Sequence, residues 1–150
     1  MTTATRILWL KAAALMLWAF AVPTWLGIVW APARAFLDGF LDVAIWPAFD
    51  GAQRLAGAEA DMLLAIVAGF SVAIGIFVWV LASAVMPRDP MLARRTVAWA
   101  MGGWFVVDSA GSWMGGAGGN VWLNAALAVP FLVPALWPEA RAARAARRAA

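Results

Sequence analysis

The chain has 150 residues, of which 65% are hydrophobic and only 13% are charged, and its formal net charge is +3. Soluble domains have roughly a quarter of their residues charged, so this composition indicates a membrane protein. The sequence contains no His and no Cys, which excludes His/Cys zinc sites, thiolate nucleophiles, imidazole catalysis, His-ligated haem and disulfides. We therefore expect no cofactor and no metal site.

Four apolar stretches have roughly the 20 residues that a helix needs to cross ~30 Å of hydrocarbon. They are residues 7–31, 62–86, 96–115 and 120–137. Only the third contains an acidic residue, Asp108, and the fourth contains Pro130 and Pro134. The pattern predicts an all-α membrane protein in which residues 1–150 form a single domain, a four-transmembrane-helix bundle.

The first stretch has a second interpretation. Residues 1–33 have a basic start, an apolar run and small residues at Ala31 and Ala33, which resembles a signal peptide with its cleavage site. The apolar run is about twice the usual length for such a signal, and Pro23 interrupts it. A retained helix is favoured, and cleavage stays open as the alternative.

Residues 33–46 predict an amphipathic interfacial helix between the first two spans. Arg34, Asp38 and Asp42 recur at every fourth position and therefore share one face, and apolar residues such as Leu37 and Phe40 occupy the others. The helix should stop near residues 46–47, where a proline follows Trp46. We expect it to cover one end of the bundle; a lid or a docking surface is the alternative.

The basic residues predict the orientation, because positively charged flanks are retained in the cytoplasm. With four crossings both termini are cytoplasmic, and five of the eight acids lie on the opposite side with Arg34 and Arg54. The nine basic residues on the cytoplasmic side are Arg6, Lys11, Arg88, Arg94, Arg95, Arg141, Arg144, Arg147 and Arg148.

The basic tail, residues 138–150, is rich in Ala and Arg. Arg141, Arg144, Arg147 and Arg148 are expected to contact anionic lipid, at about 1 kcal/mol each. A specific contact with a protein or a nucleic acid is the weaker alternative. The basic residues flank apolar runs rather than cover a polar domain, so we expect the lipid bilayer as partner and no nucleic acid.

Small and aromatic residues predict how the helices pack and where they lie in the bilayer. Gly69, Gly75, Gly111 and Gly115 lie in rows of small residues, which allow another helix of the same chain or of a partner to approach closely. Most of the eleven Trp are expected at the two membrane interfaces, Trp113 and Trp122 among them, whereas Trp18, Trp79 and Trp104 lie deeper and pack between helices or face lipid.

Asp108 is the centre of a predicted polar cluster. A carboxylate inside a span costs roughly 2.5–3.5 kcal/mol on insertion scales, so it should face the bundle interior and have partners. The third and fourth spans are joined by a short Gly/Ala turn and should form a tight antiparallel hairpin. Asp108, Ser109 or Ser112, and Asn124 then converge, and Asn120 lies at the rim, where it caps the fourth span.

Three roles are open for this cluster. It can hold two helices together by hydrogen bonds, bind the polar group of a ligand, or take up and release a proton. Catalysis is not expected, because a nucleophilic Ser needs a neighbouring base, and a Ser–Asp pair without His is not a working triad.

One family resemblance follows from the layout of residues 60–137. The basic loop from Arg88 to Arg95 precedes Trp104-Phe105-Val106-Val107-Asp108-Ser109-Ala110-Gly111-Ser112 and then Gly119-Asn120-Val121-Trp122-Leu123-Asn124. This resembles small four-span bacterial membrane proteins of the DoxX-like kind, and the resemblance implies a location in the bacterial inner membrane. Redox roles that depend on thiols do not transfer, because the chain has no Cys.

Two functions agree with these features. The first is a non-enzymatic accessory or assembly subunit of a membrane complex or homo-oligomer, indicated by the small-residue faces and the short extramembrane segments. The alternative is a small transporter or a lipid- or quinone-type binding protein with a site around Asp108 and Asn124.

Overall fold

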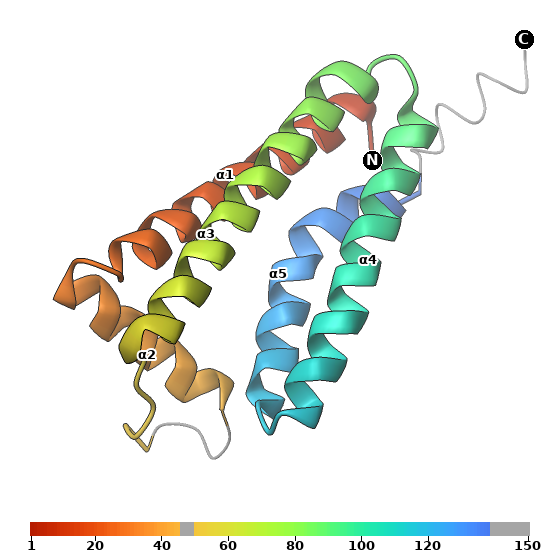
Figure 1. The fold of residues 1–150 in the computed structure, drawn as a ribbon. Coiled ribbons are helices and arrows are strands. Elements are labelled where there is room, and N and C mark those ends of the chain that lie inside the picture. Colours follow the sequence, from red (N-terminus) through yellow and green to blue (C-terminus); the bar gives the residue numbers. More distant parts are fainter. Residues whose placement is uncertain (46–49, 139–150) are drawn as a thin grey trace, which may run out of the picture.

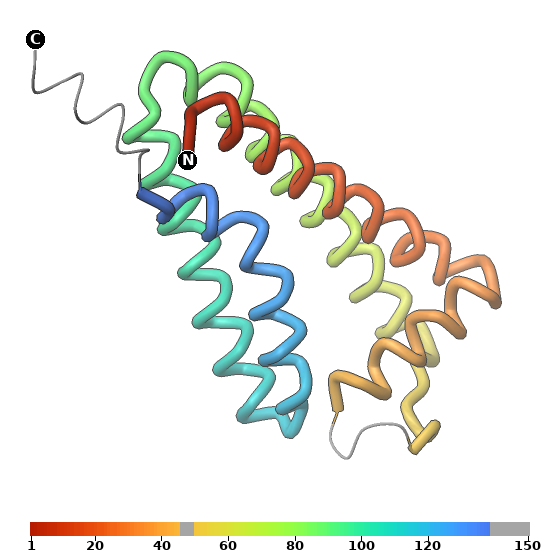
Figure 2. Tube along the Cα trace, turned by 180° about the vertical axis from the view of Figure 1, so that it is seen from behind, coloured from red at the N-terminus to blue at the C-terminus, as the bar shows by residue number. Residues whose placement is uncertain are grey.

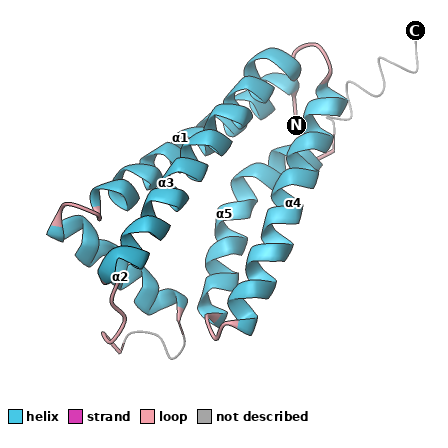
Figure 3. Cartoon of the chain, viewed as in Figure 1, coloured by secondary structure: helices cyan, strands magenta, loops and turns pink. Residues whose placement is uncertain are grey.

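The computed structural model describes residues 1–45 and 50–138, and this part of the chain is helical without any strand (Figure 3). The expected all-α class is therefore confirmed. The elements are α1 (Thr3–Leu26), α2 (Ala31–Ala44), α3 (Gly57–Val80), the π-helical segment η1 (Leu81–Val85), α4 (Pro90–Met114) and α5 (Gly118–Leu136).

In residues 1–45 and 50–138, three helices are long and apolar enough to cross a membrane: α1, α3 continued by η1, and α5. The chain is therefore compatible with a multi-pass membrane protein. Helix α4 has 25 residues but falls outside this set; its apolar residues are interrupted by Arg94, Arg95 and Asp108 and by several glycines and serines.

The helices form two pairs, α1 with α3 and α4 with α5, that diverge from one end of the molecule (Figure 1). At the narrow end lie the N-terminus, the connection from η1 to α4, and the end of α5; α2 lies across the wide end (Figures 1 and 2). The predicted α4–α5 hairpin is confirmed, and its turn has Gly116 at φ 82°, a conformation that favours glycine.

The narrow end contains the main hydrophobic core. Side chains from all the long helices meet there because the pairs are close enough to interdigitate, whereas they separate toward α2. Its best-buried members, all at most 1% exposed, include Leu10, Ala14, Met86, Val97 and Phe131.

Two arginines fix the end of α5 in this core. Arg6 is only 2% exposed; its Nε donates to the carbonyl of Pro134 (2.9 Å) and a terminal nitrogen donates to the carbonyl of Trp137 (2.5 Å). Arg94 of α4 donates to the carbonyl of Ala135 (2.8 Å). Carbonyls at a helix C-terminus lack internal partners and carry partial negative charge, so both guanidinium groups stabilise this end.

The first predicted span extends too far at its C-terminal end. Residues 7–31 were expected as one helix, but α1 ends at Leu26 and α2 begins at Ala31. The chain turns at Gly27, where an added Cβ would lie 2.5 Å from Cδ1 of Leu37. Helix α1 ends early because α2 packs closely against this turn. Hydropathy alone does not predict such a contact.

Gly75 lets α1 and α3 pack closely. The Trp18 indole lies over it, Nε1 of Trp18 donates to the carbonyl of Val72 (3.2 Å), and the ring stacks on Trp79 at 5.6 Å. The Lys11 ammonium lies over the Trp79 ring, 4.8 Å from its centroid. Trp18 and Trp79 are thus packing residues, one of the two roles expected for them.

We predict that Gly75→Ala destabilises the α1–α3 pair by about 1–3 kcal/mol, because a Cβ there would come within 2.3 Å of the Trp18 ring. The measurement is the unfolding midpoint of the purified protein in detergent. Gly69→Ala on the same helix is the matched control, since no atom lies within 4 Å of the added Cβ. Equal midpoints for the two variants would contradict the assigned role of Gly75.

Candidate functional site

The predicted polar cluster forms between α4 and α5, and one carboxylate oxygen is its centre. Oδ1 of Asp108 accepts from the Ser112 hydroxyl (3.1 Å) and from the side-chain amides of Asn120 (3.1 Å) and Asn124 (2.8 Å). Asp108 and Ser112 are one helical turn apart, as are Asn120 and Asn124, so the hairpin places two polar pairs face to face.

Both serines belong to this cluster. Asn120 donates to Oγ of Ser112 at 2.8 Å, and Asn124 donates to Oγ of Ser109 at 3.3 Å. The expectation that Asn120 caps α5 is wrong: the helix begins at Gly118, Ala117 occupies the N-cap without a side-chain bond, and the Asn120 amide is used by Asp108 and Ser112. Asn120 is the third residue of α5, and its side-chain amide bonds to α4 across the short Gly turn instead of to the N-terminus of its own helix.

The cluster forms the polar end of a cavity of about 490 Å³ between the two helix pairs. Proteins bind drug-sized molecules in cavities of roughly this size, 300–1,000 Å³. Ser71 contributes a hydroxyl that donates to its own helix at the Val67 carbonyl (2.8 Å). The remaining wall is mostly apolar and comes from all five helices: Leu17, Phe20, Phe40, Val67, Phe70, Ile74, Met101, Trp104 and Leu127 join Asp108, Asn120 and Asn124.

Helix α2 closes the wide end of the bundle near this cavity. It is the predicted amphipathic helix, displaced by two residues to Ala31–Ala44, and its residues Ala33, Leu37 and Ala44 are buried. The backbone of α5 approaches it so closely that a Cβ on Gly119 would lie 2.2 Å from the Val43 carbonyl oxygen.

The polar face of α2 holds the segment that leads to α3. Asp38 accepts from the N–H of Leu55 (2.8 Å), Asp42 accepts from the N–H of Gly51 (3.0 Å), and Arg34 forms an ion pair with Asp61. The Ala52 N–H donates to Asp50 and lowers the pKa of this exposed carboxyl below its ordinary value. These bonds agree with a structural cover.

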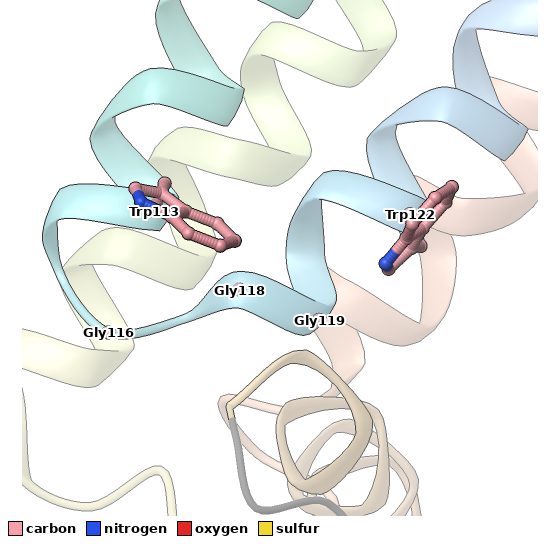
Figure 4. A pocket seen from close by; sticks show the side chains of 5 residues that line it. All are labelled: Trp113, Gly116, Gly118, Gly119 and Trp122. Carbon is pink, nitrogen blue, oxygen red and sulfur yellow. The ribbon is translucent and has the colours of Figure 1, made fainter.

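A second hollow, of about 470 Å³, lies at the α4–α5 turn, where the indoles of Trp113 and Trp122 flank Gly118 and Gly119 (Figure 4). The Trp113 ring lies 3.6 Å from the Cβ position of Gly118. Both indoles are more than 70% exposed, as expected for rings that anchor a helix end in a membrane interface. This hollow has no charged wall residue.

Of the four glycines predicted as packing positions, only Gly75 packs against an aromatic side chain of another helix, the Trp18 indole of α1. Gly69 and Gly111 have no other part of the described chain within 4 Å of a Cβ position, and Gly115 meets only its own helix. The faces of these three glycines are therefore not covered by another helix of the described chain.

The predicted lipid-contacting residues Arg141, Arg144, Arg147 and Arg148 lie outside the described residues.

The arrangement suits binding through hydrogen bonds rather than nucleophilic catalysis. Ser112 bonds to Asp108 and Asn120, Ser109 accepts from Asn124, and the sequence contains no imidazole to activate either hydroxyl. Residues 1–45 and 50–138 contain no group of three or more acids that could hold a metal ion.

The sequence did not indicate the apolar wall of the cavity. Leu17, Phe40 and Ser71 come from helices far from Asp108 in the sequence, and no periodicity predicts which residues two diverging helix pairs turn toward each other. The burial of Arg6 was not predicted either, because its charge served only to infer the orientation of the helices in the membrane.

Comparisons with family models, curated proteins and solved structures give no match. The DoxX-like resemblance stays a prediction from the layout of the sequence.

We predict that Asp108→Leu destabilises the α4–α5 hairpin by about 1–3 kcal/mol, because it leaves the donors of Ser112, Asn120 and Asn124 without their acceptor. Asp108→Asn keeps an acceptor oxygen of the same shape and should unfold close to the native midpoint. If Asp108→Leu unfolds with the same midpoint as the exposed-site control Val107→Leu, the cluster does not stabilise the hairpin.

Proposed function

We propose that the chain is a multi-pass protein of the bacterial inner membrane with four crossings and both termini in the cytoplasm. Helix α4 packs along α5, which is apolar enough to span, so a bilayer crossed by α5 is also crossed by α4. Asp108 then faces its partners on α5 instead of lipid.

The distribution of charge supports this orientation. Arg6 and Arg94 meet at the end of α5, and the exposed Arg88 lies in the connection to α4 at the same end. Acidic residues, among them Asp38 and Asp42, gather at the α2 end. Basic residues mark the cytoplasmic side of bacterial membrane proteins.

Single cysteines test the topology, since the native chain has none. In intact spheroplasts, a membrane-impermeant maleimide should label Ala52→Cys and Ala117→Cys but not Arg88→Cys, and inside-out vesicles should give the reverse. A three-span protein, in which α4 does not cross, would instead label Ala117→Cys from the same side as Arg88→Cys.

We propose further that this protein is not an enzyme and binds an amphipathic small molecule, as a transporter or as a lipid- or quinone-type binding protein. The observation that carries this function is the cavity of about 490 Å³ with an apolar wall and one polar end at Asp108, Asn120 and Asn124. Such a cavity would place a polar group against the α4–α5 cluster and an apolar body among the side chains of α1, α2 and α3.

A second candidate, an accessory subunit of a membrane complex or homo-oligomer, is supported by the open faces of α4. Gly103 and Gly111 leave space beside the helix, and Val106 and Val107 are more than 60% exposed. Small residues at such a face allow close approach of another membrane helix. A stoichiometric partner or a dimer in mild detergent, lost in Gly111→Leu, would favour this candidate.

The cavity is tested with the neutral amphiphile 4-phenylbutanol. It should bind the protein in nanodiscs saturably, measured by calorimetry after subtraction of its partitioning into empty nanodiscs. Ser71→Phe fills the cavity and should abolish the saturable component, whereas Val107→Phe, at a position 74% exposed on the outside of α4, should preserve it. Binding that survives Ser71→Phe in a folded protein would show that the cavity is not the site.

A further inference from the structure

We infer that the cavity selects amphiphiles whose polar group is a cationic ammonium bearing N–H donors. The inference rests on the proposed binding function and specifies that the ligand is positively charged. Three observations carry it: an uncompensated carboxylate, unused acceptor atoms, and four aromatic side chains in the wall of the cavity.

Among the described residues, Asp108 is the one charged residue that lines the cavity. Within residues 1–45 and 50–138 the ion pair is Arg34–Asp61, so no arginine or lysine there balances Asp108. Three cations of the described chain are engaged elsewhere: Arg34 pairs with Asp61, Lys11 lies over Trp79, and Arg94 donates to the end of α5. A carboxylate in apolar surroundings is stabilised by an opposite charge far more than it would be in water.

The polar end offers acceptors rather than donors to a ligand. The hydroxyl of Ser112 and the amides of Asn120 and Asn124 all donate to Oδ1 of Asp108. In the described chain nothing donates to the second carboxylate oxygen or to the amide oxygens of the two asparagines, and none of these oxygens is sealed from solvent. A carboxylate only accepts, so the amides must direct their NH₂ groups to it and keep their own oxygens for another donor.

Four aromatic side chains belong to the wall of the cavity, beside aliphatic ones. Phe20, Phe40, Phe70 and Trp104 all line it, and the rings of Phe20 and Phe40 lie 5.8 Å apart. The faces of aromatic rings attract ammonium groups, and the attraction increases when the cation is desolvated. The same rings accommodate an apolar body, so the wall suits both parts of a cationic amphiphile.

Three probes of nearly equal shape separate charge from hydrophobicity: 4-phenylbutylammonium, 4-phenylbutanol and 4-phenylbutanoate. Calorimetry on the native protein in nanodiscs, corrected for partitioning into empty nanodiscs, should give an ammonium affinity at least about tenfold above that of the alcohol, with the carboxylate weakest. Asp108→Asn should lower the ammonium affinity by about tenfold or more and so remove the preference for the ammonium over the alcohol. Glu59→Gln is the control, because it removes one exposed negative charge outside the cavity and should change nothing.

The outcomes separate this inference from the function on which it rests. Equal affinities for ammonium and alcohol, both abolished by Ser71→Phe, would overturn the cation preference and retain the binding function. An ammonium preference that persists in Asp108→Asn would also overturn it, since the preference would then come from the bilayer. Absence of saturable binding for all three probes would remove both proposals. If Asp108→Asn does not fold, the comparison of probes on the native chain decides the question.

Discussion

The fold depends on the buried guanidinium of Arg6, which connects α1 to the last carbonyls of α5. This contact, assisted by Arg94, joins the two helix pairs at one end and supplies partners to helix-terminal carbonyls that would otherwise be buried without donors. The pairs are thereby held together near the core around Phe131 and separate toward α2. The cavity at Asp108 exists because the helices are joined at one end and spread at the other.

Asp108 belongs to both the polar cluster and the wall of the cavity. Three donors on a single oxygen fix the carboxylate and hold α4 against α5, a role that needs no ligand. The same residue lines the cavity, where it is the only charged side chain that the described part of the chain contributes. A structural role and the proposed binding role are compatible, because they use different oxygens of one carboxylate.

Local patterns in the sequence predicted the hairpin and its cluster because the chemistry lies within seventeen consecutive residues. The i, i+4 spacing of Asp108 with Ser112 and of Asn120 with Asn124 defines two faces, and the short Gly turn makes them meet. The end of α1 and the burial of Arg6 were not predictable in this way, since both result from contacts between distant segments. The apolar wall was missed for the same reason.

The contact between Gly119 and the last carbonyls of α2 connects two parts of the molecule that otherwise share little. No side chain separates the two backbones there, so a displacement of α2 is transmitted to α5 without a compressible layer between them. The next residue is Asn120, whose amide bonds Asp108. The loop bonded to Asp38 and Asp42 and the carboxylate of Asp108 are thus connected through one direct contact between the backbones of α2 and α5.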